Sequence, residues 1–401
     1  MSGTEVPRYG KHDKPPISPT KSQLTVELSG KICYDEYNYD DNETENWIMA
    51  LKVGIIGCGG ISNSHMSGYK ALGDAVEVVA CCDINFEKAQ EYAARYGIPH
   101  CYPDCYSMLK EFQPDLVSVC TWNSAHAECT IAALNAGCNV LCEKPMAMNA
   151  KEAVAMKAAA EKNGKLLMLG FVRRHGNDAM AARDFVEKGF LGDIYYAKAS
   201  YLRRCGFPGG WFGDKSRSGG GPLIDLGVHV IDLARYIMGS PKPVTVFGAT
   251  FDKIGARDHI KTTGWVSETV VDKPIFTVED LATAMIRFDN GAVLHVEASF
   301  NLNLKNPTGD INIFGDKAGL SLDPFELYTE CNDRIADIVI HGDNGFDFHR
   351  DFDREVKNFY EAVSGKAPCI ATAEDGVELM RILDAVYESA ATGRSVDIVR
   401  E

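Results

Sequence analysis

The chain has 401 residues, of which 45% are hydrophobic and 24% charged, the composition of an ordinary globular protein with room for two domains. Its net charge of −15 argues against nucleic-acid phosphates or anionic lipids as partners, because an acidic surface repels both, although a small anion could still bind locally. No stretch approaches the ~18 consecutive apolar residues of a membrane span, and the first residues lack the apolar core of a signal peptide. We therefore expect a cytoplasmic protein with no membrane partner.

The 13 cysteines are scattered through segments that resemble core strands and helices. An odd number of cysteines without a signal peptide argues against a disulfide framework, so we expect reduced, buried thiols. Cys101 and Cys105 have the one spacing that suggests a metal site, but no second pair lies at a suitable distance. We therefore predict no bound metal.

Residues 1–48 differ in composition from the rest of the chain. A proline- and lysine-containing stretch, "KPPISP", is followed by "YDEYNYDDNETEN", which has no helical or strand period. These features predict an extended or disordered N-terminal arm. The tyrosines of the arm leave open a contact with a neighbouring subunit.

Residues 49–171 alternate short β-branched runs with alanine-rich helical stretches. This alternation predicts right-handed βαβ units and a doubly wound parallel sheet, covered by helices on both faces. The expected strands are "LKVGIIG", "VEVVACCD", "DLVSVCT", "NVLCEKP" and "LLMLGF".

A glycine-rich loop follows the first expected strand and precedes a helical stretch. Gly57 allows a tight turn, Gly59 lets a pyrophosphate approach the backbone, and the helix N-terminus supplies free N–H groups. The predicted loop ligands are Gly57, Cys58, Gly59, Gly60 and Ile61. Asp83 ends the second expected strand, where a carboxylate binds the ribose hydroxyls and repels a 2′-phosphate. NAD is therefore favoured over NADP, with nearby Lys88 the argument for NADP.

The sequence pattern changes in residues 172–401, where expected strands are joined by short turns. The stretch 281–300 predicts two strands around an Asp-Asn-Gly turn, 311–323 predicts another hairpin, and the last helical stretch ends at Gly393. We expect an α+β domain with an open, mostly antiparallel sheet and helices on one face. The other face needs a partner, which predicts a homo-oligomer, either a dimer, a tetramer or a hexamer.

Six motifs follow one another along the chain. They are "GIIGCGGIS", "TWNSAH", "EKPMA", "GFVRR", "GWFGDKSRSGGGPLIDLGVHVID" and "ESAATGRSV". In this order they resemble the Gfo/Idh/MocA oxidoreductase family over residues 50–398. The resemblance implies an N-terminal Rossmann domain, a C-terminal sheet domain, and an active site between them at the nicotinamide. It also implies a catalytic trio of Lys144, Asp225 and His229. Trp122 departs from the proline common at that position, which puts the local shape of the pocket in doubt.

The resemblance also implies residues near the nicotinamide. These are Thr121, Asn123, His126, Glu143 and Lys144. The side chains implied or considered as walls of a sugar pocket are Arg173, Arg174, Arg203, Arg204, Trp211 and Phe212, for which ion pairing and packing are equally good explanations.

The chemistry of the trio fits the oxidation of an alcohol. Asp225 and His229 lie four residues apart and therefore on one face of a helix. An imidazole with a pKa of about 6.5 can accept a hydroxyl proton at neutral pH. Lys144 brings a cation to the oxygen on which negative charge develops. Asp232, one turn further along, is placed to orient His229.

The predicted function is NAD-dependent oxidation of a secondary hydroxyl of a sugar, cyclitol or glycoside, with C3 of a glycoside as one form of it. Two alternatives remain. The first is a tightly bound nicotinamide that shuttles hydride between two sugars or assists glycosidic cleavage, and the second is a non-catalytic NAD sensor.

Overall fold

The computed structural model describes residues 50–400 except 258, 261–265 and 268–274. The predicted arm, residues 1–48, lies outside these residues. None of the helices in the described ranges has the length and apolarity needed to cross a membrane.

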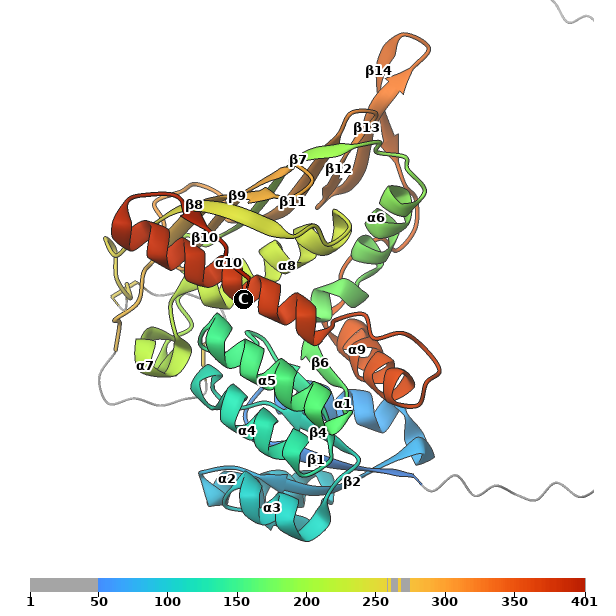
Figure 1. Ribbon diagram of the computed structural model, residues 1–401, viewed down its shortest axis with the longest axis vertical. Coiled ribbons are helices and arrows are strands. Elements are labelled where there is room, and N and C mark those ends of the chain that lie inside the picture. Colours follow the sequence, from blue (N-terminus) through green and yellow to red (C-terminus); the bar gives the residue numbers. More distant parts are fainter. Residues whose placement is uncertain (1–49, 258, 261–265, 268–274, 401) are drawn as a thin grey trace, which may run out of the picture. The chain divides into compact units, whose positions relative to one another are not determined.

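The first sheet has six parallel strands in the order β3-β2-β1-β4-β5-β6, the order of a dinucleotide-binding fold (Figure 1). Its strands are β1 (Leu51–Ile56), β2 (Val76–Cys82), β3 (His100–Tyr102), β4 (Leu116–Val119), β5 (Asn139–Glu143) and β6 (Leu167–Gly170). The helices that connect them are α1 (Ser62–Ala71), α2 (Phe86–Tyr96), α3 (Cys105–Phe112), α4 (Asn123–Asn135) and α5 (Ala150–Asn163), with a 3₁₀ turn η1 (Gly73–Ala75) before β2. The predicted parallel sheet is confirmed, and β3 is a short strand that the sequence pattern missed.

The second sheet has nine strands in the order β14-β13-β12-β11-β7-β10-β9-β8-β15. Its strands are β7 (Ile194–Leu202), β8 (Pro243–Phe251), β9 (Leu281–Phe288), β10 (Val293–Ser299), β11 (Thr308–Gly315), β12 (Gly319–Leu322), β13 (Phe325–Cys331), β14 (Arg334–Val339) and β15 (Val396–Asp397). All neighbouring pairs are antiparallel except β7 with β10. The two predicted hairpins are therefore confirmed as β9–β10 and β11–β12.

Helices pack against one face of the second sheet, as Figure 1 shows. The remaining helices and short helical turns are η2 (Val172–His175), α6 (Asn177–Glu187), η3 (Gly210–Gly213), α7 (Lys215–Ser218), a π-helical turn η4 (Leu223–Gly227), α8 (Val228–Ile237), α9 (Phe348–Val363) and α10 (Ala373–Thr392). The opposite face carries side chains that alternate with buried neighbours, among them Phe247 and Met285, each 52% exposed. The layer arrangement confirms the expected open sheet with one uncovered face.

Helix α9 comes late in the chain but packs against α1 of the first sheet. Gly68 of α1 allows this approach, because a Cβ atom there would lie 2.6 Å from the Cβ atom of Val356. The C-terminal part of the chain therefore contributes side chains to the nucleotide-binding side.

Candidate active site

The glycine-rich loop has the backbone that the sequence predicts. Gly57 adopts φ +91°, and a Cβ atom there would lie 2.7 Å from the carbonyl oxygen of Cys120, so only glycine fits. No atom lies within 4 Å of a Cβ built on Gly59, which leaves open space above the loop. This is the cradle that a pyrophosphate group requires.

Asp83 is held at the end of β2 by two backbone donors. The N–H of Cys58 donates to Oδ2 at 2.9 Å and the N–H of Asn85 donates to Oδ1 at 2.8 Å. The carboxylate also lines the cavity described below, so its remaining lone pairs can accept hydrogen bonds from ribose hydroxyls. Lys88 lines the same region and is exposed to solvent.

One cavity of about 1670 Å³ runs from this loop to the second sheet. Its volume exceeds the ~300–1,000 Å³ of a typical small-molecule site, which leaves room for a dinucleotide and a second ligand. The predicted site residues that line it are Gly57, Gly59, Gly60, Ile61, Asp83, Thr121, Asn123, Glu143, Lys144, Arg173, Trp211, Asp225 and His229. Cys58 and His126 are not among the lining residues.

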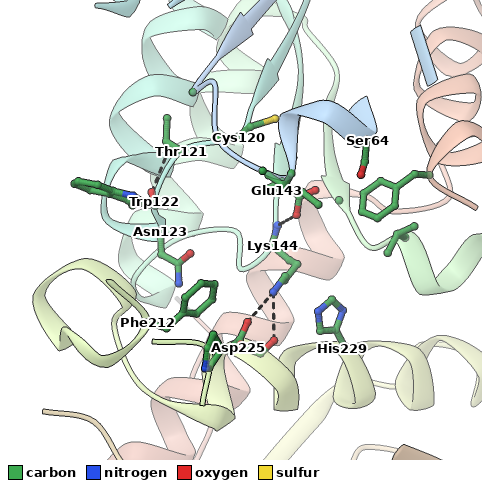
Figure 2. Close-up of a pocket in the computed structure, with 18 of the residues that line it drawn as sticks. Ser64, Cys120, Thr121, Trp122, Asn123, Glu143, Lys144, Phe212, Asp225 and His229 are labelled. Carbon is green, nitrogen blue, oxygen red and sulfur yellow. Dashed lines mark hydrogen bonds and ion pairs between the residues drawn. The ribbon is translucent and has the colours of Figure 1, made fainter. Parts of the chain in front are cut away.

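Lys144 and Asp225 meet inside this cavity from different parts of the chain (Figure 2). Lys144 follows β5 and Asp225 lies in the π-helical turn η4. The Lys144 ammonium group donates to Asp225 Oδ1 at 3.0 Å and to the Asp225 carbonyl oxygen at 3.3 Å. The ion pair is only partly exposed, so the cation is fixed while it remains accessible from the cavity.

The helix that carries Asp225 and His229 is not a regular α-helix. The Val228 N–H donates to the Leu223 carbonyl five residues back, before α8 continues with normal geometry. Such π-turns occur preferentially at functional sites. Glu279 holds the start of this turn, because its carboxylate accepts from the N–H groups of Gly221 and Leu223 at 3.0 and 3.2 Å.

His229 points toward the Lys144 amine in Figure 2, and no described residue forms a hydrogen bond with its ring. Burial lowers the pKa of His229 well below its usual range, and the cations Lys144, Arg173 and Arg203 lower it further. The imidazole is therefore neutral at neutral pH. A neutral, unpaired imidazole is available to accept a proton from a ligand in the cavity.

The expectation that Asp232 orients His229 is wrong. Asp232 forms a buried bidentate ion pair with Arg174, with N–O distances of 2.6 and 2.9 Å. Arg174 also donates to Asp375 at 3.0 Å. Arg174 is therefore a structural residue that joins η2, α8 and α10, and it is not a wall of the pocket. Its charge, with that of Arg235, lowers the pKa of Asp375 to about 2 against the effect of burial.

The other candidate wall residues divide into two groups. Arg173 lines the cavity, donates to Asp178 at 2.7 Å and lies over the Phe346 ring at 4.4 Å. Trp211 and Phe212 form a stacked pair that also lines it, with ring centroids 4.1 Å apart. Arg203 reaches the cavity, whereas Arg204 is exposed outside its lining.

The residues of the "TWNSAH" motif mainly shape the cavity wall. His126 is 1% exposed, with its ring nitrogens 2.7 Å from the Pro145 carbonyl oxygen and 3.2 Å from that of Thr121. Asn123 donates to the Ser218 carbonyl at 2.7 Å, which ties α4 to α7. His126 therefore acts on the pocket by holding its backbone.

Two family models match the chain. One, described as "Oxidoreductase family, NAD-binding Rossmann fold", matches residues 51–171, and the other, "Oxidoreductase family, C-terminal alpha/beta domain", matches residues 183–398. The chain belongs to the Gfo/Idh/MocA family of oxidoreductases. The predicted family and its NAD cofactor are thereby confirmed.

Several Gfo/Idh/MocA relatives resemble the chain over most of its length. D-glucoside 3-dehydrogenase of Escherichia coli K12 is 39% identical over 353 residues, covering 87% of this chain and 97% of the relative. Myo-inositol 2-dehydrogenase of Thermotoga maritima is 26% identical and covers 87% of this chain and 98% of its own. The structure of levoglucosan dehydrogenase with NADH and levoglucosan has a TM-score of 0.74 at 28% identity, covering 88% of this chain and 100% of the other.

Sequence reasoning missed a buried cluster behind Glu143 in this Gfo/Idh/MocA chain. His65 lies between Glu143 Oε1 at 2.9 Å and Ser118 Oγ at 3.0 Å, and Glu355 of α9 completes the cluster. Among the described residues, His65, Glu143 and Glu355 each place one nitrogen or oxygen atom within 4.8 Å of the other two. Cys101 and Cys105 are free thiols. A histidine on the buried side of α1 was the available signal, but Glu355 is too distant along the chain for the pattern to connect them.

Proposed function

We propose that the chain oxidises a secondary hydroxyl group of a sugar, cyclitol or glycoside with NAD⁺, and that a glycoside C3 hydroxyl is the preferred group. The observation that carries this proposal is the convergence of Lys144, Asp225 and His229 on one cavity that begins at the glycine-rich loop. The identity to a D-glucoside 3-dehydrogenase supports the choice of a glucoside and of C3.

The roles of the trio follow from their charges and contacts. His229, neutral and without a hydrogen-bond partner among the described residues, accepts the hydroxyl proton at its ring nitrogen. The Lys144 ammonium group stabilises the negative charge that develops on the same oxygen. Asp225 fixes that ammonium group and balances its charge in the partly buried site. When bound, NAD⁺ supplies the hydride acceptor.

The remaining chain provides the fit for the dinucleotide. The open loop at Gly59 would hold the pyrophosphate and Asp83 the adenosine ribose, with Glu143 and Asn123 near the nicotinamide end. A carboxylate already fixed by two N–H donors disfavours a 2′-phosphate. NAD is therefore the proposed cofactor over NADP.

The direct test is to incubate the purified protein with NAD⁺ and a panel of glucosides, free sugars and cyclitols. Formation of NADH is followed by absorbance, and the product is identified by mass spectrometry and NMR. We expect NADH together with a 3-keto glycoside. Bound NAD⁺ without oxidation of any panel member would instead favour the sensor function.

A hydride shuttle between two sugars is the second candidate. It is favoured by similarity to the structure of an aldose-aldose oxidoreductase from Caulobacter crescentus, with a TM-score of 0.70 at 25% identity over 87% of this chain and 99% of the other. Nicotinamide that copurifies with the protein and changes redox state with one sugar and back with another would establish this function.

We also propose a homo-oligomer in the cytoplasm. The uncovered face of the second sheet carries Phe247 and Met285, and the strand register places Tyr196 and Phe314 on the same face, with their stacked ring centroids 5.7 Å apart. A second copy of the chain would cover these apolar side chains. Sedimentation of the parent and of a Met285→Lys variant tests this, with a smaller assembly expected for the variant.

A further inference from the structure

Glu355 is a buried carboxyl group that nothing in the described structure neutralises. It is 0% exposed, and neither of its carboxyl oxygens has a hydrogen-bond partner. A buried charge without a partner is strongly unfavourable, so such a group holds a proton or a counter-ion. Glu355 lies on α9 next to Val356, the residue that packs against Gly68 of α1.

The partner that Glu355 faces is already a carboxylate. Oxygen and nitrogen atoms of Glu355, Glu143 and His65 all lie within 4.8 Å of one another. Glu143 accepts from His65 Nε2 at 2.9 Å and from the Lys144 N–H at 3.1 Å, and these contacts help to lower its pKa. Glu143 therefore carries the negative charge of the pair, and Glu355 carries the proton.

Few groups around Glu355 can change charge near neutral pH. Burial raises the pKa values of Tyr69, from α1, and of Cys120, after β4, so both stay neutral. On η2, burial lowers the pKa of His175 to about 3, and the charge of Arg174 is paired with Asp232 and Asp375.

On α9 itself, Asp351 is paired with Arg350 and Arg354, so its charge is balanced within the helix. Glu355 is thus the group of this cluster that is buried without a hydrogen-bond partner and faces another carboxylate.

The cluster lies directly behind the cavity wall. Glu143 lines the cavity beside Lys144, and so does Phe352 of α9, whose ring centroid lies 6.1 Å from that of His65. Under the function proposed above, the nicotinamide end of NAD occupies this part of the cavity. Oxidised nicotinamide carries a positive charge, and reduced nicotinamide does not.

We propose that Glu355 holds a proton in the free protein and releases it when NAD⁺ binds, so that the carboxylate pair balances the charge of the oxidised nicotinamide. The O–H bond of the Glu355 carboxyl group breaks, its electron pair stays on the carboxylate, and the proton leaves to the buffer. NADH brings no such charge and leaves the proton in place. Glu355 acts through Glu143 and is therefore a positioning residue. This inference rests on the proposed function only for the location of the nicotinamide.

As a consequence, the affinity for NAD⁺ should depend on pH in a way that the affinity for NADH does not. Release of one proton on binding makes the affinity for NAD⁺ rise by up to about tenfold per pH unit. This rise spans the pH range between the pKa of Glu355 in the complex and its higher pKa in the free protein. The affinity for NADH lacks this slope.

The test is calorimetric titration of the full chain with NAD⁺ and NADH in buffers of different ionisation enthalpy. The parent should release close to one proton per chain with NAD⁺ and none with NADH. In Glu355→Gln, which keeps the size but has no proton to lose, the release and the pH slope should disappear. Glu361→Gln makes the same change at a partly exposed position of α9 and should behave as the parent.

A second measurement needs no variant. Infrared difference spectra of the parent should show loss of one protonated carboxyl band on adding NAD⁺ and not on adding NADH.

Binding of NAD⁺ without proton release, or equal release in Glu355→Gln, would overturn the inference. So would a stoichiometric divalent cation found by elemental analysis, because the cation would then occupy the place of the proton. Failure of NAD⁺ to bind at all would instead contradict the proposed function.

Discussion

The two ends of the cavity are built by different means. At the glycine-rich loop the contacts come from the backbone, and Asp83 is fixed by the N–H groups of Cys58 and Asn85. At the other end the working groups are side chains, with Lys144 from the first sheet and Asp225 from the segment before α8. The proposed dinucleotide site is thus built from residues close together in the sequence, whereas the proposed chemistry depends on how two distant segments pack.

The largest effect is expected at the cation. Replacing Lys144 by methionine removes the charge that stabilises the developing alkoxide, and turnover should fall by about 10²–10⁴-fold. Affinity for NAD⁺, measured by calorimetry, should stay close to that of the parent. Lys157→Met, at a surface ion pair, is the control and should retain activity. Equal turnover in the Lys144 variant and the parent would show that the chemistry is elsewhere.

The next effect concerns stability at the junction between the two regions. Asp232→Asn leaves Arg174 without one of its buried carboxylates, so we expect a loss of about 3–5 kcal/mol in the free energy of unfolding. Urea denaturation with a Glu374→Gln control measures this change. A stable variant with reduced turnover would instead restore the idea that Asp232 serves His229.

The third prediction concerns the pH dependence of activity, which we expect His229 to set. Its pKa is lowered, so the neutral form persists to acidic pH, and activity is lost only as pH falls through this lowered value. The acid limb of kcat/KM should therefore lie below the ordinary imidazole pKa of about 6.5. In His229→Asn, turnover should drop by roughly 10²-fold and this limb should vanish. An unchanged limb in the variant would assign it to another group.

Asp83 tests the other end. Asp83→Asn removes the charge from the carboxylate at the proposed ribose site, and the Kd for NAD⁺ should rise by about ten- to a hundredfold. Turnover at saturating NAD⁺ should change little. Discrimination against NADP⁺ should weaken, as measured by the ratio of the two kcat/KM values. A preserved ratio would remove Asp83 from cofactor selection.

The sequence predicts the two regions unequally well. Gly57, Gly59 and Asp83 lie at fixed positions relative to two successive strands, so a local pattern is enough to place them. Arg174 and Asp232 could not be paired in advance, because an arginine after β6 and an aspartate on α8 meet only when the tertiary structure forms. The consequence was an incorrect partner for His229.

Irregular backbone geometry also could not be predicted from the sequence pattern. The residues of the stretch 223–237 predict a regular helix. The π-helical turn at Leu223–Gly227 could not be predicted, because its start is held by Glu279, which is distant in the sequence. Similarly, Glu355 lies on a helix whose apolar side faces α1, so its sequence neighbours give no sign of the cluster it joins. Such features arise from contacts between segments distant in the sequence.

The ion pairs of Arg174 with Asp232 and Asp375 restrict how the segments around the cavity can move. One guanidinium group locks the segment after β6 to both α8 and α10, and the pairs are too deeply buried for water to replace them cheaply. A motion that swings the segment after β6 away from α8 and α10 would have to break these ion pairs. We therefore expect the proposed cofactor and sugar to enter and leave through the mouth of the cavity.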